Sequence, residues 1–301
     1  MLQPLRKTLS FARMIWEFIE SDFVTFAVPN SAFGIFGAFA STKLICNDLS
    51  TIPSALDILK RLPLVLAFNV GNLLVFDLAN QRSPQSVVED RINKPWRPIP
   101  RGKITCDQTR RLMLVVVPIT LALNYYLGAW NQGIAIHILT WLYNDLGGGD
   151  EVFVRELIIA IAYGFFNSGS LTIAVGPECS LSALGITWTI IVSGVILTTM
   201  QVQDLKDQKG DKTRKRRTIA LFLGEKVSRT SIAFFVCFWS CVCEYFWNIE
   251  PLAYSVTAVA AAVVILRVLF IRSPKGDART WRLWCLWHAS LYTLPVLTSN
   301  F

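Results

Sequence analysis

Charged side chains are scarce in this sequence. Asp, Glu, Lys and Arg make up 17% of the 301 residues, against about 25% in a typical soluble domain. Hydrophobic residues account for 53%, and they gather in blocks that approach the length needed to cross a bilayer. This composition is not that of an ordinary soluble protein. We expect one integral membrane domain over residues 1–301, with the lipid bilayer as its partner.

Histidine is nearly missing too, and cysteine lacks a metal-binding spacing. The two histidines, His137 and His288, are isolated, and the seven cysteines form no Cys-x-x-Cys pair. An odd number of cysteines, most of them within apolar runs, is not typical of a disulfide framework. We therefore expect neither a zinc site nor a disulfide-stabilised fold, and we expect these side chains to be packed in the interior.

A cleavable signal peptide is not expected, because the first residues lack a continuous apolar core. They fit an amphipathic helix over residues 1–22, which would lie in the membrane interface. A frayed polar tail is the alternative. The apolar stripe of this helix comprises Leu5, Leu9, Ala12, Trp16 and Ile19.

What the sequence does contain is a series of apolar segments of helical length. Membrane helices tolerate proline, so Pro29, Pro63 and Pro118 do not interrupt the pattern. We expect an all-α integral membrane protein with nine transmembrane helices bundled around a central apolar cavity. The spans are expected at about residues 23–45, 57–80, 109–127, 129–144, 153–175, 181–203, 228–247, 252–271 and 282–299.

The basic residues are distributed unevenly among the connections. Lys and Arg cluster in residues 82–111, 206–217 and 267–282, which share one side of the membrane if the N-terminus is cytosolic. This positive-inside pattern accounts for most of the net charge of +8. We therefore expect no nucleic-acid partner, and we expect the loops after the second and sixth spans to share the cytosolic face.

The stretch from Gln203 to Arg217 carries a regular set of acids. Asp204, Asp207 and Asp211 are spaced i, i+3, i+7 directly after an apolar run, so a helix would place three carboxylates on one face. Three carboxylates repel one another unless a cation lies between them, and a hard divalent ion with oxygen ligands is the simplest candidate. A solvated helix end with mixed charges is the alternative.

A second acidic region lies at the end of the second span. Asp77, Asn80 and Gln81 share a helix face, and Glu89-Asp90 follow shortly before a basic, proline-rich stretch. Acids at two helix ends on one membrane face can hold magnesium ions between them. For Asp77 the alternative is a helix-end charge in water, and membrane topology alone could explain the basic stretch.

Two stretches resemble a known family. Residues 93–100, read Asn-Lys-Pro-Trp-Arg-Pro-Ile-Pro, with Gly102, look like the signature after the first Asp-rich motif of UbiA-superfamily membrane prenyltransferases. Asp204-x-x-Asp207-x-x-x-Asp211 is similar to their second motif. The standard first motif is Asn-Asp-x-x-Asp-x-x-x-Asp, yet Ser86 and Arg82 stand four and eight residues before Asp90. This altered layout resembles the fungal UbiA-type terpene cyclases.

The resemblance implies a Mg²⁺-dependent enzyme that ionises a prenyl diphosphate, such as farnesyl or geranylgeranyl diphosphate. We expect catalysis to depend on Asp77, Asp90, Asp204 and Asp207. The metal ligands would come from Asp77, Asn80, Glu89, Asp90, Asp204, Asp207 and Asp211, and the diphosphate would be bound by Arg91, Lys94, Arg97, Arg101 and Lys212. The pocket would be lined by Phe68, Asn72, Phe76, Tyr163, Phe166, Asn167 and Trp188.

Two enzymatic functions stay open. A terpene cyclase ionises its substrate and cyclises the same molecule, whereas a prenyltransferase passes the prenyl group to an aromatic or quinone-type acceptor. The altered first motif, and the lack of a further titratable group placed to deprotonate an acceptor, favour the cyclase. A transporter is a third possibility, but acids at helix ends rather than at mid-membrane argue against it. We expect an endoplasmic reticulum protein whose site opens to the cytosol, without an obligate protein partner.

Overall fold

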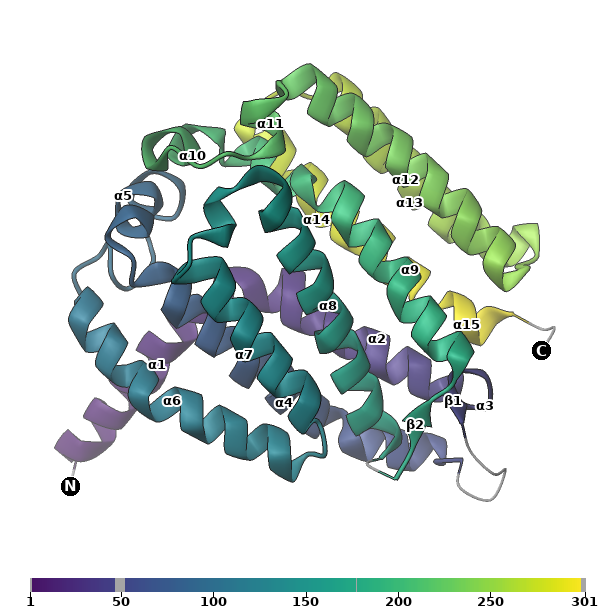
Figure 1. Cartoon of the computed structure of the whole chain (residues 1–301), viewed down its shortest axis with the longest axis horizontal. Coiled ribbons are helices and arrows are strands. Elements are labelled where there is room, and N and C mark those ends of the chain that lie inside the picture. The colour runs from purple at the N-terminus through teal and green to yellow at the C-terminus, as the bar shows by residue number, and fades with distance from the viewer. Residues whose placement is uncertain (1, 47–51, 177, 299–301) are drawn as a thin grey trace.

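The computed structural model describes residues 2–46, 52–176 and 178–298. Helices form almost all of it, and the long ones lie side by side in a bundle (Figure 1). A short antiparallel pair, β1 (Ile45–Cys46) and β2 (Ser180–Leu181), joins two connections at one end of the bundle. The structure thus confirms the expected all-α class.

The helical elements follow one another with short connections. In chain order they are α1 (Leu2–Asp22), η1 (Phe23–Ala27), α2 (Val28–Phe39), α3 (Ser41–Leu44), α4 (Ala55–Gln81), α5 (Pro84–Asn93), α6 (Cys106–Tyr126), α7 (Trp130–Asn144), η3 (Gly148–Asp150), α8 (Val152–Val175), α9 (Ala183–Thr199), η4 (Met200–Lys206), α10 (Gln208–Arg214), α11 (Ile219–Phe222), α12 (Glu225–Trp247), α13 (Pro251–Phe270), α14 (Pro274–Leu291) and α15 (Leu294–Leu297).

Helix occupies each of the nine segments in which a span was expected, but several ends differ. The first segment begins as the π-helix η1 and continues as α2 and α3, and the last is divided between α14 and α15. The nine-span topology and its cytosolic orientation stay predictions. In the described part of the chain, five helical segments are long and apolar enough to cross a membrane: Ala55–Gln81, Val152–Val175, Ala183–Leu205, Glu225–Trp247 and Pro251–Phe270.

Small and amide side chains hold α2, α4 and α8 together at the centre. Gly34 of α2 lies so close to α8 that a Cβ there would be 2.6 Å from the backbone of Ser170. Asn69 of α4 donates hydrogen bonds to the hydroxyls of Ser31, at 3.1 Å, and Ser170, at 2.8 Å. Close packing and interhelical hydrogen bonds take the place of the hydrophobic effect between helices in lipid. They fix α4, which carries Asp77 of the first acidic stretch, against its neighbours.

The two acidic stretches meet at one end of this bundle. α5 lies beside α10 there, although more than a hundred residues separate them (Figure 1). The Asn93 amide donates to the carbonyl of Asp207 at 3.0 Å and accepts a hydrogen bond from the N–H of Gly210 at 3.2 Å. Gly210 permits this contact, because a Cβ there would lie 2.2 Å from the Asn93 side-chain nitrogen.

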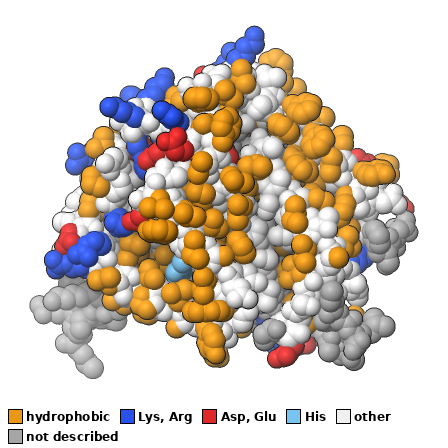
Figure 2. Space-filling model, viewed as in Figure 1, with side chains coloured by type: hydrophobic (Ala, Val, Ile, Leu, Met, Phe, Trp, Pro, Cys, Tyr) orange, Lys and Arg blue, Asp and Glu red, His pale blue; other side chains and the backbone are white. Residues whose placement is uncertain are grey.

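The surface of the molecule separates charge from apolar area. Figure 2 shows Lys and Arg side chains gathered over the α5 and α10 end, while hydrophobic side chains cover much of the flank. Exposed large hydrophobic side chains on α7, α8 and α9 include Ile138, Trp141, Leu157, Ile186 and Ile190. A continuous exposed apolar surface of this kind is expected of a membrane-embedded bundle rather than of a soluble monomer.

Candidate active site

A cavity opens at the end of the bundle where the two acidic stretches meet. It encloses about 1120 Å³ of empty space, which includes part of its open mouth. Helices α1, α4, α5, α7, α8, α10 and α14 and the short elements η1 and η4 contribute to its lining. The polar and charged lining residues are Asp22, Thr25, Asn80, Asp77, Glu89, Lys94, Arg97, Thr140, Arg155, Gln203, Asp204, Asp207, Asp211 and Arg216.

The rest of the lining is aromatic and aliphatic. Of the side chains expected in a pocket, Phe76, Tyr163 and Phe166 line this cavity. Phe26 of η1 packs edge-on against both Tyr163 and Phe166, with ring centroids 4.7 Å apart in each pair. Tyr143 lies against Phe76 at 5.3 Å between ring centroids. One cavity therefore joins a charged region to a region of aromatic faces.

Phe68 and Asn72, also expected in the pocket, lie outside this lining. Phe68 is buried behind Phe166, with ring centroids 6.1 Å apart. The Asn72 amide exchanges hydrogen bonds with the Asn124 amide, at 2.9 Å and 3.0 Å, and so joins α4 to α6. This amide pair uses the polar capacity that a pocket role would need.

The structure also places Asn167 and Trp188 away from the lining. Trp188 packs against Phe246 and Trp247 of α12, at 6.0 Å and 5.4 Å between ring centroids. The helix that carries Trp188 is apolar on every side, so its sequence does not reveal which side faces a cavity. Asn167 is fully buried one residue beyond the cavity-lining Phe166.

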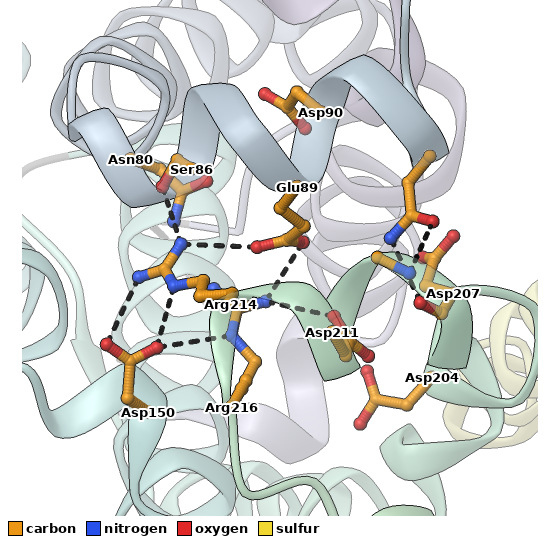
Figure 3. Close-up of polar contacts among 12 residues, drawn as sticks. Asn80, Ser86, Glu89, Asp90, Asp150, Asp204, Asp207, Asp211, Arg214 and Arg216 are labelled. Atoms are coloured by element: carbon orange, nitrogen blue, oxygen red, sulfur yellow. Dashed lines mark hydrogen bonds and ion pairs between the residues drawn. The ribbon is translucent and has the colours of Figure 1, made fainter.

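The second acidic stretch is not one continuous α-helix. Asp204 lies in the 3₁₀ segment η4, Asp207 precedes α10, and Asp211 lies within α10. All three nevertheless line the cavity, and Figure 3 shows Asp204 and Asp211 close to one another. The tightening of the chain into η4 is what turns these carboxylates inward at the end of an apolar helix.

Arg155 of α8 is the partner of Asp204, and the sequence analysis missed it. Its two terminal nitrogens donate to the two Asp204 carboxylate oxygens at 2.9 Å and 2.8 Å. Arg155 also pairs with its neighbour Glu156, and all three side chains are buried. The available signal was a charged pair inside an otherwise apolar span, since ionisable residues in such segments are usually functional.

The first acidic stretch divides between the cavity and the protein interior. Asp77 lines the cavity at 2% exposure, and its Oδ2 atom has no hydrogen-bond partner. Asn80 lines it too and donates to Asn144 at 3.0 Å. Asp90 instead accepts hydrogen bonds from Arg97 at 3.1 Å and 3.0 Å and is not part of the lining. Burial raises the pKa of Asp90, against the opposing charges of Arg97 and Lys94.

An arginine pair joins the first acidic stretch to the second, as Figure 3 shows. Arg214 bonds Ser86 at 2.5 Å and Glu89 at 3.3 Å from one nitrogen, and it pairs with Asp150 at 2.8 Å. Arg216 contacts the same Glu89 at 3.4 Å. In the same view Asp90 points away from this network. Glu89, expected as a metal ligand, is thus held by two guanidinium groups.

The basic residues expected to bind diphosphate also separate into two groups. Lys94 and Arg97 line the cavity, whereas Arg91, Arg101 and Lys212 are exposed side chains outside its lining. The cavity gains Arg155 and Arg216, which were not expected there. The basic run lies at the end of the molecule where the cavity opens, and only part of it faces the cavity.

The charges that line the cavity do not balance. Six carboxylates, from Asp22, Asp77, Glu89, Asp204, Asp207 and Asp211, face only four basic side chains. Burial, and then the charge of Asp204, raise the pKa of Asp211 to about 8. Within residues 2–46, 52–176 and 178–298, no three His, Cys, Asp or Glu side chains converge closely enough to hold a metal ion by themselves.

This donor set nevertheless fits magnesium. Mg²⁺ retains several waters and takes one or two protein carboxylates together with substrate phosphates, so a preformed cage of three carboxylates is not required. The unpartnered Oδ2 atoms of Asp77 and Asp211 are buried oxygens of the type it prefers, and both residues line the cavity. An excess of carboxylate would also repel an anionic ligand unless cations neutralise it.

Residues 77–291 match the UbiA prenyltransferase family. The chain belongs to this family. The match begins at Asp77 and contains both acidic stretches, and it confirms the resemblance seen in the sequence. Residues 1–76, which include α1, η1 and most of α4, lie outside the matched region.

Several curated relatives resemble nearly the whole chain at low identity. It is 28% identical to the fumagillin beta-trans-bergamotene synthase of Aspergillus fumigatus over 96% of this chain and 93% of that protein. It is 26% identical to the diterpene cyclase eriG of Hericium erinaceus, over 86% and 80% of the two chains. It is 25% identical to the polyprenyl transferase eriF of Hericium erinaceus, over 89% and 88%.

Solved structures show the same fold. A UbiA homolog from Archaeoglobus fulgidus, bound to GPP and Mg²⁺, superposes with a TM-score of 0.62 at 12% identity, over 94% of this chain and 99% of that one. A UbiA homolog from Aeropyrum pernix K1 gives a TM-score of 0.64 at 15% identity, over 90% and 96%. Together with the apolar helices, the family and fold identify an integral membrane protein.

Proposed function

We propose that this chain is a membrane-embedded terpene cyclase that acts on farnesyl or geranylgeranyl diphosphate. The observation that carries the proposal is a single cavity with charged side chains in one part and aromatic faces in the other. An allylic diphosphate has the matching shape, an anionic head on an apolar chain. Relatives named as a bergamotene synthase and a diterpene cyclase, which match most of the chain, support the same reaction class.

The charged part of the cavity would bind the diphosphate. Lys94, Arg97, Arg155 and Arg216 present donors to its oxygens, and guanidinium groups suit such anions because they bind in a bidentate manner. Bound Mg²⁺ would neutralise the leaving diphosphate as a Lewis acid. The carboxylates of Asp77, Asp204, Asp207 and Asp211 would hold it. Asn80 remains a candidate ligand, while Asp90 and Glu89 hold arginines in this structure.

The aromatic part of the cavity would hold the isoprenoid chain and its cation. Phe26, Phe76, Tyr163 and Phe166 present ring faces and edges to the same space. A ring face attracts a nearby cation, and the effect is larger when water is excluded. An apolar wall also keeps water from capturing the cation before a distal double bond reaches it. Because neighbouring rings hold these side chains edge-to-face, they would determine the conformation in which the isoprenoid chain is bound.

Prenyl transfer to a separate acceptor is the second candidate function. The chain also resembles the polyprenyl transferase eriF and, at 31% identity over 46% of its length, the digeranylgeranylglyceryl phosphate synthase of Sulfolobus acidocaldarius. A transferase needs a cavity that admits a second substrate and accepts its proton. The acidic side chains that line this cavity lie in its charged part, and the aromatic part presents rings, aliphatic side chains and hydroxyl groups.

One experiment separates the two functions. The purified full-length protein is incubated in detergent with Mg²⁺ and with farnesyl or geranylgeranyl diphosphate, one at a time and without an acceptor. We expect inorganic diphosphate and a cyclic hydrocarbon in the hexane extract. Diphosphate release that requires an added aromatic acceptor, with a product that carries both parts, would establish the transferase. Linear alcohols alone would show that the cavity ionises the substrate but does not fold it.

A further inference from the structure

The cavity has an acidic residue that lies outside the family match. Asp22 is the last residue of α1, and it lines the cavity beside Asp77. The family match begins at residue 77, so neither acidic motif includes this carboxylate. Its side chain is 30% exposed, which leaves it open to a ligand within the cavity.

Asp22 and Asp77 approach the same atom. The Nη2 nitrogen of Arg97 donates to Oδ2 of Asp22 at 3.1 Å and lies 3.9 Å from Oδ1 of Asp77. The other terminal nitrogen of Arg97 is taken by Asp90. One guanidinium therefore has three carboxylates around it, and two of these belong to the cavity. Lys94, which lines the same cavity, adds a second positive charge near the three carboxylates, so the acids still outnumber the bases here.

Asp77 gives a second, independent indication of a cation site. Its Oδ2 atom is buried and has no hydrogen-bond partner in the described part of the protein, although the residue lines the cavity. An unpaired carboxylate oxygen at 2% exposure is costly. A cation placed between Asp22 and Asp77 would remove that cost and would face the space that the diphosphate is expected to fill.

The local backbone explains how Asp22 reaches the cavity. The π-helix η1 begins at the next residue, Phe23, and the helix then continues as α2. A π turn adds a residue to the helical turn and is frequent at functional sites. Here Asp22, Thr25 and Phe26 all line the cavity, so the wider turn points a carboxylate and an aromatic ring into it together.

We infer that Asp22 is a metal-binding residue, and that its carboxylate and that of Asp77 together hold one divalent cation at the diphosphate end of the cavity. The inference rests on the proposed function, because it assigns part of the same site. It also accounts for the altered first motif. Ser86 and Ser83 stand where that motif would have its first two aspartates, and a carboxylate from α1 supplies what they lack.

Metal binding without turnover tests the inference. Mn²⁺ replaces Mg²⁺ as an EPR-visible probe, and inorganic diphosphate replaces the substrate, with the full-length protein in detergent. We expect Asp22→Asn to bind one ion fewer than wild type at limiting Mn²⁺, because it removes one of the two carboxylates proposed to hold that ion. Asp77→Asn should lose the same ion. The double variant should therefore lose no further ion.

Glu20→Gln is the matched control, since it removes a carboxylate from the same helix outside the cavity lining. Asp22→Glu should retain the ion. Unchanged Mn²⁺ binding in Asp22→Asn would overturn the inference and leave the proposed function standing. A wild-type protein that binds no Mn²⁺ with diphosphate would overturn the proposed function itself.

A measurement on the wild-type chain covers the case in which Asp22→Asn does not fold. Fe²⁺ with ascorbate and peroxide cleaves a backbone close to the bound metal. We expect Mg²⁺-competed cleavage near residue 22 as well as near residues 77 and 204. Cleavage near residue 204 without any near residue 22 would contradict a metal-binding role for Asp22.

Discussion

Asp204 is paired with a cation of the protein itself, Arg155. Both of its carboxylate oxygens accept hydrogen bonds from Arg155, and both residues are buried. A divalent cation must therefore share or displace that guanidinium. Arg155 also lines the cavity, so its donors would then be available to a bound diphosphate.

The variant Asp204→Asn should lose both the proposed metal ligand and the charged partner of Arg155. We expect diphosphate release to fall by roughly 100- to 1000-fold, which is the usual loss when one preorganised electrostatic partner is removed. We also expect about 3–5 kcal/mol of destabilisation, because Arg155 would keep a buried charge without its main partner. Product analysis and chemical unfolding measure the two effects.

The double variant Asp204→Asn/Arg155→Gln is the control for stability. With Glu156→Gln added, because Glu156 is the other buried partner of Arg155, it removes all three charges and should regain much of the lost stability without regaining activity. If Asp204→Asn alone retained wild-type activity, Asp204 would not belong to the catalytic site.

The raised pKa of Asp211 predicts that the stability of the folded protein depends on pH. Its pKa rises from 3.8 to about 8 because the carboxyl is buried and lies near Asp204. In metal-free buffer the folded protein then holds this proton between about pH 4 and pH 8, where the unfolded chain has released it. The free energy of unfolding should therefore fall as the pH rises through this range, and level off above it.

Unfolding in EDTA at a series of pH values checks this expectation. Asp211→Asn keeps the size and polarity of the side chain but has no proton to lose, so its stability should change less over the same range. A wild-type curve parallel to that of Asp211→Asn would show that Asp211 does not titrate as described.

Some residues of the cavity could be predicted from their spacing in the sequence, and others could not. The spacing of Asp204, Asp207 and Asp211 identified three carboxylates that do line one cavity. The neighbours Glu89 and Asp90 could not be separated by spacing, because both lie on the short helix α5, where one lines the cavity and the other bonds Arg97. Which side of a ten-residue helix faces inward depends on tertiary contacts.

At the scale of elements, the contact between α5 and α10 unites the two acidic stretches. It depends on Gly210, where a Cβ would lie 2.2 Å from the side-chain nitrogen of Asn93. We expect Gly210→Ala to separate the helices and to cost about 1–3 kcal/mol, as overpacking usually does. Activity should fall further than stability, because Asp207 and Asp211 would move with α10.

The variant Asn93→Ala provides the comparison for Gly210→Ala. It removes the side chain that the new methyl group would strike, together with two hydrogen bonds. The double variant should therefore cost less than the sum of the two single changes when unfolding is measured. Strict additivity would indicate that the two residues do not contact one another in the protein.

The connections that carry α5 and α10 should lie on the same side of the membrane. They meet in the structure (Figure 1), and Lys and Arg gather around them, as expected for a cytosolic face. Cysteines introduced at the exposed Gln85 and Thr213 should react alike with a membrane-impermeant thiol reagent. A cysteine at Glu250, between α12 and α13 at the other end of the bundle, should react from the opposite side.

The background for this labelling should lack Cys237 and Cys241, which are exposed on α12. Opposite accessibility of positions 85 and 213 would be incompatible with one shared site. Labelling of both from the luminal side of microsomes would instead reverse the predicted orientation and leave the site intact.

Elements could be predicted where their apolar runs are long. α4 and α8 follow continuous apolar segments and were expected within a few residues of their observed ends. The π turn η1 and the 3₁₀ segment η4 were not expected, because neither has a sequence pattern distinct from that of an α-helix. Both lie beside the cavity, where they point Asp22 and Asp204 inward. The structure was needed for the part of the backbone that departs from regular helix.

At the scale of the whole molecule, the cavity is an assembly of distant parts of the chain. Its carboxylates come from α1, α4, α5, η4 and α10, and its aromatic side chains from η1, α4, α7, α8 and α14. Glycine and amide contacts such as Gly34 with Ser170 hold the central helices without any ligand. The charged end, by contrast, has more acidic than basic side chains in its lining.

Metal and diphosphate together should therefore stabilise the bundle as a whole. A ligand that binds only the folded protein adds about 2.7 kcal/mol when its concentration is one hundred times its dissociation constant. We expect Mg²⁺ and inorganic diphosphate to raise the melting temperature more when added together than the sum of their separate effects. Diphosphate alone meets six carboxylates against four basic groups, and so it should bind weakly.

EDTA should reverse this stabilisation, and Asp204→Asn should show little of it. Lys215→Ala, which removes an exposed charge from the same end of the protein outside the cavity lining, should respond as wild type does. Equal stabilisation by diphosphate with and without Mg²⁺ would show that the arginines and Lys94 suffice to bind the anion. In that case the carboxylates that face the cavity would need a role other than holding a metal ion.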